Sequence, residues 1–214
     1  MKNNKAFVLL TLVSVIVAFI LFKRYYQTSS PQEQPAPSQV SKLIKDHNPR
    51  LGPDDAKVQI VEFLDPECEA CREMAPIVKK LMSEYDGKVQ LMVRYMPFHG
   101  NSTKAATYLE EAREEGKYWE AMAVLFENQP AWANHHDPKP ELIPTFLVYA
   151  GIKNAKSFDE NVLLSKHRWK VDLDFADGKM LGVKYTPTFF VNGKMLQEIG
   201  YEALKQAIEL ELAK

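Results

Sequence analysis

The apolar and polar positions of this chain switch between the two periods that distinguish strands from helices. An almost wholly apolar run, Val58–Leu64, stops at an Asp-Pro turn and predicts a buried strand. Residues 72–85 then place apolar side chains at helical spacing, and residues 88–95 alternate before a Met-Pro stop. A strand, a helix and a second strand in this order predict a parallel βαβ unit with a right-handed crossover.

A long stretch of helical spacing follows the second predicted strand. Its first helix begins at an Asn101/Ser102 cap, and Pro144 is placed to open a later helix, because proline is tolerated in the first turn. We therefore expect an all-helical insertion over about residues 99–181. Its predicted helices cover residues 101–115, 118–128, from about 141, and about 159–181.

Strand character returns near the C-terminus. Residues 187–191 favour a strand, Asn192 and Gly193 form the most favoured two-residue turn, and residues 194–198 complete a predicted hairpin. Residues 202–212 predict a closing helix. These elements predict an α/β domain in which helices interrupt the order of the strands.

A separate apolar run, residues 6–22, is preceded by Lys2 and Lys5. As a helix it would extend about 25 Å, at the short end of what spans a bilayer and also compatible with a signal-peptide core. A small-x-small cleavage site does not follow it. The Lys-Arg-Tyr-Tyr sequence that does follow is typical of the interfacial collar of a spanning helix, so we favour an uncleaved membrane anchor over residues 1–24.

Residues 25–47 are rich in Pro, Gln and Ser and predict a flexible linker to a domain over residues 48–214. Basic residues flank both ends of the apolar run, so the positive-inside rule gives little bias. A short N-terminal tail kept in the cytoplasm is the ordinary outcome. It predicts a single-pass protein of the cell membrane whose folded domain is extracytoplasmic, on the periplasmic or outer face.

The charged residues of the chain exclude one class of function. With 27 basic and 28 acidic residues among 214, the chain has no electrostatic footprint for nucleic acid. Two further groups of charged or titratable residues predict only solvated surface. They are the helix face of Glu110, Glu111, Glu114 and Glu115, and the His135-His136 pair in a proline-rich loop.

The two cysteines of the chain, Cys68 and Cys71, lie where the first predicted helix begins. Unpaired N–H groups and the helix dipole favour the thiolate there, which is the form that attacks a disulfide. Three residues apart, the two thiols share a helix face and can form a disulfide with each other. A structural zinc would need four ligands, and a structural disulfide would close too short a loop to stabilise the fold much. The pattern favours thiol–disulfide exchange without a metal or organic cofactor.

A second chemistry for the same thiols stays open. Cys68 and Cys71, together with Met96 or His99, offer soft ligands of the kind that bind Cu(I). The chain would then be a membrane-tethered metal carrier.

Two motifs at the expected separation make a family resemblance specific. Residues 63–71 read Phe-Leu-Asp-Pro-Glu-Cys-Glu-Ala-Cys, and residues 182–194 read Gly-Val-Lys-Tyr-Thr-Pro-Thr-Phe-Phe-Val-Asn-Gly-Lys. With the element order, they resemble the DsbA-like disulfide oxidoreductases of the thioredoxin superfamily. The resemblance covers about residues 48–214 and implies a thioredoxin fold with an inserted all-helical domain.

The resemblance implies a role for each residue of the site. Cys68 would be the exposed nucleophile and Cys71 the buried partner that resolves the mixed disulfide. Thr186 and Pro187 would share a cis peptide bond that faces the cysteines and pairs with substrate backbone. Glu62 would relay a proton to or from Cys71, and burial would raise its pKa. Strand alternation alone also permits an outward-facing Glu62 at a sheet edge.

The direction of electron flow depends on the residues around the cysteines. Where strongly oxidising members carry Pro-His, this chain carries Glu69 and Ala70, and Glu67 adds further negative charge. These carboxylates are expected to raise the pKa of Cys68 relative to such members, which favours a milder oxidant, a reductase or an isomerase. The insertion keeps an oxidase as our first reading.

The resemblance also implies partners. Substrates would be unfolded or reduced exported proteins. Each turnover leaves the enzyme in the wrong redox state, so a membrane recycling partner is needed. It would be a quinone-linked oxidase for a disulfide donor, or an electron-donating reductase for the opposite direction.

Overall fold

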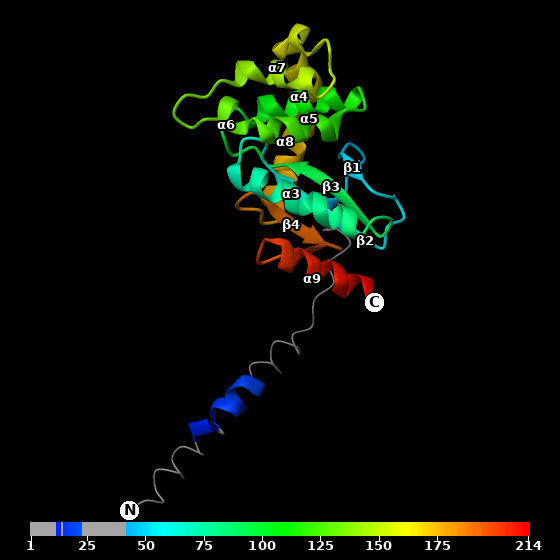
Figure 1. Cartoon of the computed structure of the whole chain (residues 1–214), viewed down its shortest axis with the longest axis vertical. Coiled ribbons are helices and arrows are strands. Elements are labelled where there is room, and N and C mark those ends of the chain that lie inside the picture. The colour runs from blue at the N-terminus through cyan, green and yellow to red at the C-terminus, as the bar shows by residue number, and fades with distance from the viewer. Residues whose placement is uncertain (1–11, 14, 23–41) are drawn as a thin grey trace, which may run out of the picture. The chain divides into compact units, whose positions relative to one another are not determined.

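Apolar runs of the sequence form the centre of a five-stranded mixed sheet in the computed structural model, which describes residues 12–13, 15–22 and 42–214 (Figure 1). The strand order is β1-β3-β2-β4-β5, and the strands are β1 (Arg50–Leu51), β2 (Val58–Leu64), β3 (Val89–Tyr95), β4 (Thr188–Val191) and β5 (Lys194–Met195). The predicted parallel pairing of β2 with β3 is confirmed, while β1, β4 and β5 are antiparallel to their neighbours. Strand β5 is shorter than predicted, and the sequence analysis missed the two-residue β1.

Helices cover both faces of the sheet, which explains why β2 reads as an almost continuous apolar run. Helix α3 (Glu69–Glu84) and helix α9 (Tyr201–Leu212) pack on one face, where Ile60 lies in one core cluster with Val78 and Leu204. Helix α8 (Glu160–Met180) contacts β3 on the other face, where Phe63 packs with Phe175. Alternate residues of β2 therefore face different helices.

The stretch between β3 and β4 is helical, as the spacing predicts, and its helices before α8 form a layer at one end of the sheet (Figure 1). Its core cluster includes the wholly buried Leu109, Leu125 and Trp132. Pro144 lies in the first turn of its helix, as predicted. The helices besides α8 are α4 (Ser102–Glu114), α5 (Tyr118–Glu127), α6 (Gln129–Trp132) and α7 (Ile143–Tyr149), with 3-10 turns at Pro140–Leu142 and Ala155–Ser157.

The expectation of a solvated glutamate face on α4 is wrong at Glu110. This side chain is completely buried and accepts hydrogen bonds from the Tyr95 hydroxyl at 3.1 Å and from Lys170 Nζ at 2.7 Å. The sequence spacing gave no sign of this, because both partners are distant in the chain. Glu110 is thus a structural link between α4, β3 and α8.

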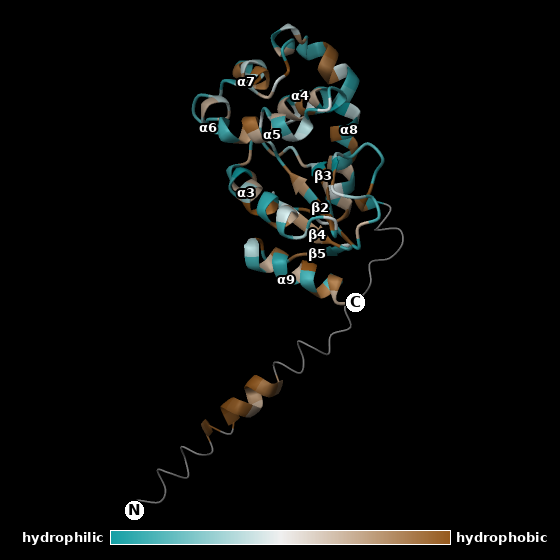
Figure 2. Cartoon of the chain, turned by 45° about the vertical axis from the view of Figure 1, so that its right-hand side comes forward, coloured by the Kyte–Doolittle hydropathy of each residue, from teal (hydrophilic) through white to brown (hydrophobic). Residues whose placement is uncertain are grey.

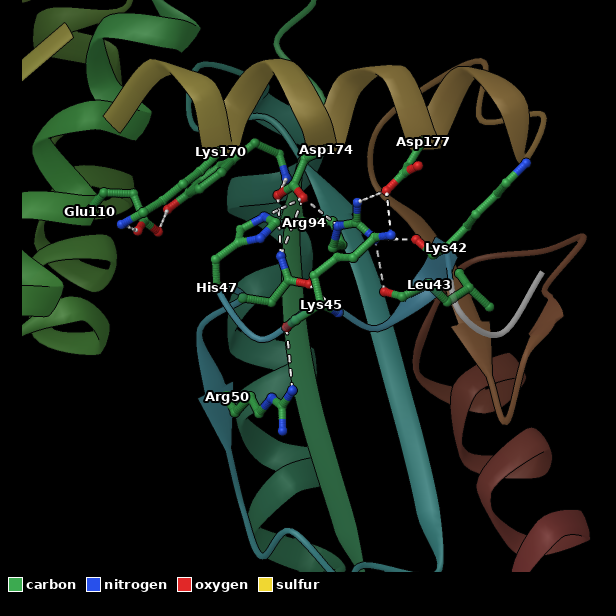
Figure 3. A network of polar contacts seen from close by, with 12 residues as sticks. Lys42, Leu43, Lys45, His47, Arg50, Arg94, Glu110, Lys170, Asp174 and Asp177 are labelled. Carbon is green, nitrogen blue, oxygen red and sulfur yellow. Dashed lines mark hydrogen bonds and ion pairs between the residues drawn. The ribbon is translucent and has the colours of Figure 1, made fainter. Parts of the chain in front are cut away.

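A buried ion network joins β3 to α8 and to the segment before β1 (Figure 3). Arg94 is wholly buried, and its guanidinium donates to carboxylate oxygens of Asp174 and Asp177. It also donates to the backbone oxygens of Lys42 and Leu43. A charge is tolerated in the core only when it is paired and hydrogen-bonded, and here each end of the guanidinium has a partner.

The chain divides into two units, Met1–Gln34 and Pro35–Lys214. The described residues 15–22 of the first unit are helical and hydrophobic throughout (Figure 2). Across residues 12–13, 15–22 and 42–214, no helix has both the length and the apolar character needed to cross a membrane. Residues 1–11, 14 and 23–41 of the predicted anchor and linker lie outside the described residues, so the anchor and that part of the linker stay predictions. The expectation of a flexible linker is wrong for residues 42–47, because Leu43 is buried and His47 lies 2.9 Å from the Asp174 carboxylate of the domain.

Candidate active site

The two cysteines begin helix α3, as the sequence predicts. Cys68 is the residue before the first turn, and its backbone N–H donates to the Asp65 carbonyl oxygen at 3.1 Å. Cys68 is 8% exposed and Cys71 is completely buried. The two cysteines are not joined by a disulfide in this structure. One thiol is therefore partly accessible to another protein, while the second is enclosed behind it.

Local contacts shift the pKa values of the two thiols in opposite directions. The hydrogen bond with the Cys71 side chain, helped by Thr186 and by the backbone of Cys71 and Ala70, outweighs burial and lowers the pKa of Cys68 to about 5. Burial, followed by the hydrogen bond with Cys68, raises the pKa of Cys71 well above its usual value. Near neutral pH the pair thus holds a thiolate at Cys68 and a thiol at Cys71. Ala70 contributes through its backbone rather than its methyl group.

The second predicted motif reaches the same place from the far end of the sequence. The peptide bond between Thr186 and Pro187 is cis. The Cys68 thiol lies 3.4 Å from the backbone oxygen of Thr186, to which it donates. Residues separated by more than a hundred positions are thereby brought together beside the Cys68 thiol, which is nearly buried and not exposed as the family resemblance implies.

Glu62 lies on the central strand of the sheet, so the alternative of an outward-facing edge residue is wrong. Its side chain is 4% exposed and has no hydrogen-bond partner within the described part of the chain. Burial raises its pKa from 4.5 to about 8, and its charge contributes to the raised pKa of Cys71. Glu62 is therefore a mostly protonated carboxyl at neutral pH that interacts electrostatically with the enclosed thiol.

A cavity of about 890 Å³ reaches Glu62 from the side of α3 and α5. Its walls are mainly apolar and include Ala75, Met82, Trp119 and Phe126. The Glu62 carboxyl is therefore at the wall of a mainly apolar space and is not enclosed on every side by packed side chains.

Glu67 and Glu69 each have a partner of their own, which the sequence did not reveal. Glu67 is buried and accepts from the Asn101 backbone N–H at 2.6 Å, at the N-terminus of α4. The exposed Glu69 carboxylate lies 2.7 Å from Nε2 of His135. A helix N-terminus and an imidazole thus offset these charges. The crowded negative charge that we expected to favour the thiol form does not prevent a lowered pKa at Cys68.

Asp65 is a site residue whose side-chain role the sequence analysis missed. It is completely buried, and one carboxylate oxygen accepts from the Phe98 backbone N–H at 2.7 Å and lies 2.7 Å from Nδ1 of His99. A polar residue directly after a buried strand was the available signal. Its partners follow β3, so only the parallel pairing of β2 and β3 brings them near.

Soft-metal binding finds little support in this arrangement. Across the described residues, the one group of three His, Cys or carboxylate side chains close enough to hold a metal is Glu111, Glu114 and His167. Lys166 already pairs with both of those glutamates. Met96 packs in the core on the α8 face of the sheet. The copper alternative stays a prediction.

Gln129 connects the motif to the helical layer. Its side-chain Nε2 donates to the backbone oxygens of Pro66 at 2.9 Å and Cys68 at 3.0 Å. Because Gln129 belongs to α6, the turn that carries Cys68 is bonded to the insertion as well as to the sheet.

Comparisons with known proteins agree with this geometry. The family model described as Thioredoxin matches residues 45–210. Disulfide bond formation protein D of Bacillus subtilis is 27% identical over 176 residues, which cover 77% of each chain. Probable disulfide bond formation protein D of Bacillus cereus is 25% identical over 220 residues, the full length of both chains. The crystal structure of oxidised BdbD from Bacillus subtilis superposes with a TM-score of 0.66 at 28% identity, covering 85% of this chain and 97% of that one.

Proposed function

This chain belongs to the thioredoxin superfamily as a DsbA-like thiol:disulfide oxidoreductase, and we propose that it forms disulfides in exported proteins. The observation that carries the oxidase direction is the lowered pKa of Cys68. A stabilised thiolate favours the reduced enzyme, so the oxidised enzyme readily gives its disulfide away. The names of the two Bacillus relatives support the same direction.

The proposed reaction begins with the oxidised Cys68–Cys71 pair. A substrate thiolate attacks the sulfur of Cys68, a mixed disulfide forms, and the bond between Cys68 and Cys71 breaks. A second substrate thiolate then attacks the substrate sulfur of the mixed disulfide, and Cys68 leaves as a thiolate. Two electrons pass from the substrate to the enzyme, and the substrate keeps the disulfide.

Glu62 has a specific task in the first step. Because the pKa of Cys71 is raised, its thiolate is a poor leaving group unless it receives a proton. The Glu62 carboxyl, whose pKa is about 8, holds a proton at neutral pH and is the nearby acid. The cavity beside it supplies the route by which that proton is replaced. When the enzyme is reoxidised, the proton returns along the same path.

The backbone at Thr186 is the proposed binding site for the substrate peptide. Its carbonyl oxygen lies 3.4 Å from the Cys68 sulfur, so an extended peptide aligned with this segment presents its cysteine to the reactive thiol. Pro187 follows it and opens the way into β4. Recognition through main-chain hydrogen bonds suits substrates that share cysteines but no sequence.

The proposed setting is the outer side of the cell membrane, with residues 1–24 as an anchor and a quinone-linked membrane enzyme as the oxidant that restores the disulfide. An oxidising compartment is where protein disulfides persist. The second candidate function is a reductase or isomerase, which the lack of a basic residue between Cys68 and Cys71 favours. In that case a membrane reductase would supply electrons.

The reduction potential of the Cys68–Cys71 pair tests the direction. Full-length protein in detergent is equilibrated with glutathione buffers, and the thiols are trapped by alkylation. A potential near about −120 mV, the strong-oxidant end, would support the oxidase. A potential between roughly −200 and −270 mV would contradict it and support the reductase or isomerase.

A further inference from the structure

Two histidines from separate segments of the insertion meet at the active site. His99 follows β3, and His135 follows α6. Their ring centroids are 5.6 Å apart, and the rings are inclined at 53°. Neither belongs to the C-x-x-C motif, and the sequence analysis assigned His135 only to a solvated loop.

Each histidine is fixed to the motif through a carboxylate. His99 Nδ1 lies 2.7 Å from an Asp65 oxygen, and His135 Nε2 lies 2.7 Å from a Glu69 oxygen. Asp65 in turn contacts both cysteines through its backbone. Its carbonyl accepts from the Cys68 N–H at 3.1 Å, and its N–H lies 3.5 Å from the Cys71 sulfur.

The charges that face His99 come from the turn that carries the cysteines. Partial burial favours the neutral imidazole, but the hydrogen bond to Asp65 and the charges of Asp65, Cys68 and Glu67 raise the pKa of His99. Interaction between two charges is mutual, so the proton on His99 also favours the thiolate of Cys68. The second imidazole faces Glu69, the remaining acid on this turn.

We propose that His99, supported by His135, is the cation that stabilises the Cys68 thiolate in place of a basic residue within the Glu-Ala dipeptide. This inference rests on the proposed function, because it describes how the same site acquires its redox strength. His99 acts as a positioning and charge-balancing residue, since it contacts Asp65 and not the reacting sulfur. The insertion therefore supplies the electrostatics that the motif lacks.

The proposal has a pH signature. Below the raised pKa of His99 the imidazolium is present and the thiolate is favoured. As pH rises through that pKa, His99 loses its proton, and Asp65, Glu67 and Glu69 are no longer offset by it. The reduced enzyme then loses stabilisation relative to the disulfide form, so the enzyme becomes a weaker oxidant.

Three full-length variants test the proposal through the thiolate absorbance of the reduced protein and the glutathione equilibrium. His99→Asn keeps a donor for Asp65 but carries no charge. His99→Arg carries a permanent charge. His136→Ala removes an exposed histidine from the same loop as His135 and is the matched control.

We expect His99→Asn to raise the pKa of Cys68 by about one unit. The equilibrium constant with glutathione should shift about tenfold toward the disulfide form, which corresponds to about 30 mV. His99→Arg should retain the low pKa and lose the pH signature, and His136→Ala should change neither quantity.

An unchanged Cys68 pKa in His99→Asn, or the same change in His136→Ala, would overturn the inference. If His99→Asn does not fold, a raised Cys68 pKa in His99→Arg would overturn it as well. The outcome for the oxidase proposal is separate. A reducing potential in the wild type, with the His99-dependent shift intact, would reject the oxidase direction and leave the role of His99 standing.

Discussion

Neighbouring strands of the sheet bury an ionisable side chain in opposite ways. Glu62 on β2 points toward α3 without a hydrogen-bond partner among the described residues, while Arg94 on β3 points toward α8 and bonds two carboxylates and two carbonyls. The two positions are close in the sheet. Phe63, the residue after Glu62 on β2, pairs with Arg94 on β3. A buried charge with partners stays ionised in the core and becomes costly to break, whereas a buried acid without partners has a shifted pKa and is available for chemistry.

Glu62→Gln removes the buried carboxyl that lacks a partner among the described residues, and it should have the largest effect on the pH dependence of stability. Because burial raises the Glu62 pKa from 4.5 to about 8, its contribution to stability is fully present below pH 4.5 and is lost as pH rises toward 8. The wild type should lose at most roughly 5 kcal/mol over this window through this group, and Glu62→Gln should not. Urea denaturation at several pH values measures the difference.

The same variant tests the proton relay. Exchange with a reduced peptide should slow by about 10²-fold, the lower end of what a positioned acid contributes. Glu120→Gln is the control, since Glu120 lines the same cavity but is exposed and pairs with Lys117. Equal pH profiles in Glu62→Gln and wild type would refute the assignment.

Arg94→Met removes the central cation of the buried ion network. It removes the wholly buried guanidinium from the carboxylates of Asp174 and Asp177, which keep their other hydrogen-bond donors, so the free energy of unfolding should fall by about 3 kcal/mol, the lower end of the loss for a broken buried pair. The Cys68 pKa of the folded fraction should stay unchanged, because the network lies on the other face of the sheet. Arg168→Met removes an exposed pair with Asp172 and should cost less than about 1 kcal/mol. A loss of similar size in both variants would contradict the comparison.

Of these variants, Glu67→Gln should change the free energy of unfolding least. Glu67 resembles Arg94 in having partners, but those partners are N–H groups at the start of α4. Loss of its charge should cost about 0.5–1 kcal/mol of stability. The Cys68 pKa should move by less than about half a unit, because the helix N-terminus already offsets the carboxylate. A fall of a full unit would restore the view that Glu67 opposes the thiolate.

The sequence predicted those elements that depend on neighbouring residues alone. The βαβ unit, the cysteines at a helix start and the proline that opens α7 follow from apolar period and turn chemistry. Partners that are distant in the sequence could not be predicted in this way. Asp65 meets His99 only because β2 and β3 are parallel neighbours, and Glu67 is offset only because α4 begins beside it.

The side-chain bonds from Gln129 to the turn before α3 have a consequence for how such enzymes diversify. The turn that carries the reactive thiol belongs to two modules at once, the sheet that supplies it and the insertion that holds it. An exchange of the insertion between related chains would thus alter redox behaviour while every letter of the C-x-x-C motif stayed the same. In such a chimaera, the C-x-x-C sequence would come from the chain that supplied the sheet, while the reduction potential would depend on the chain that supplied the helices.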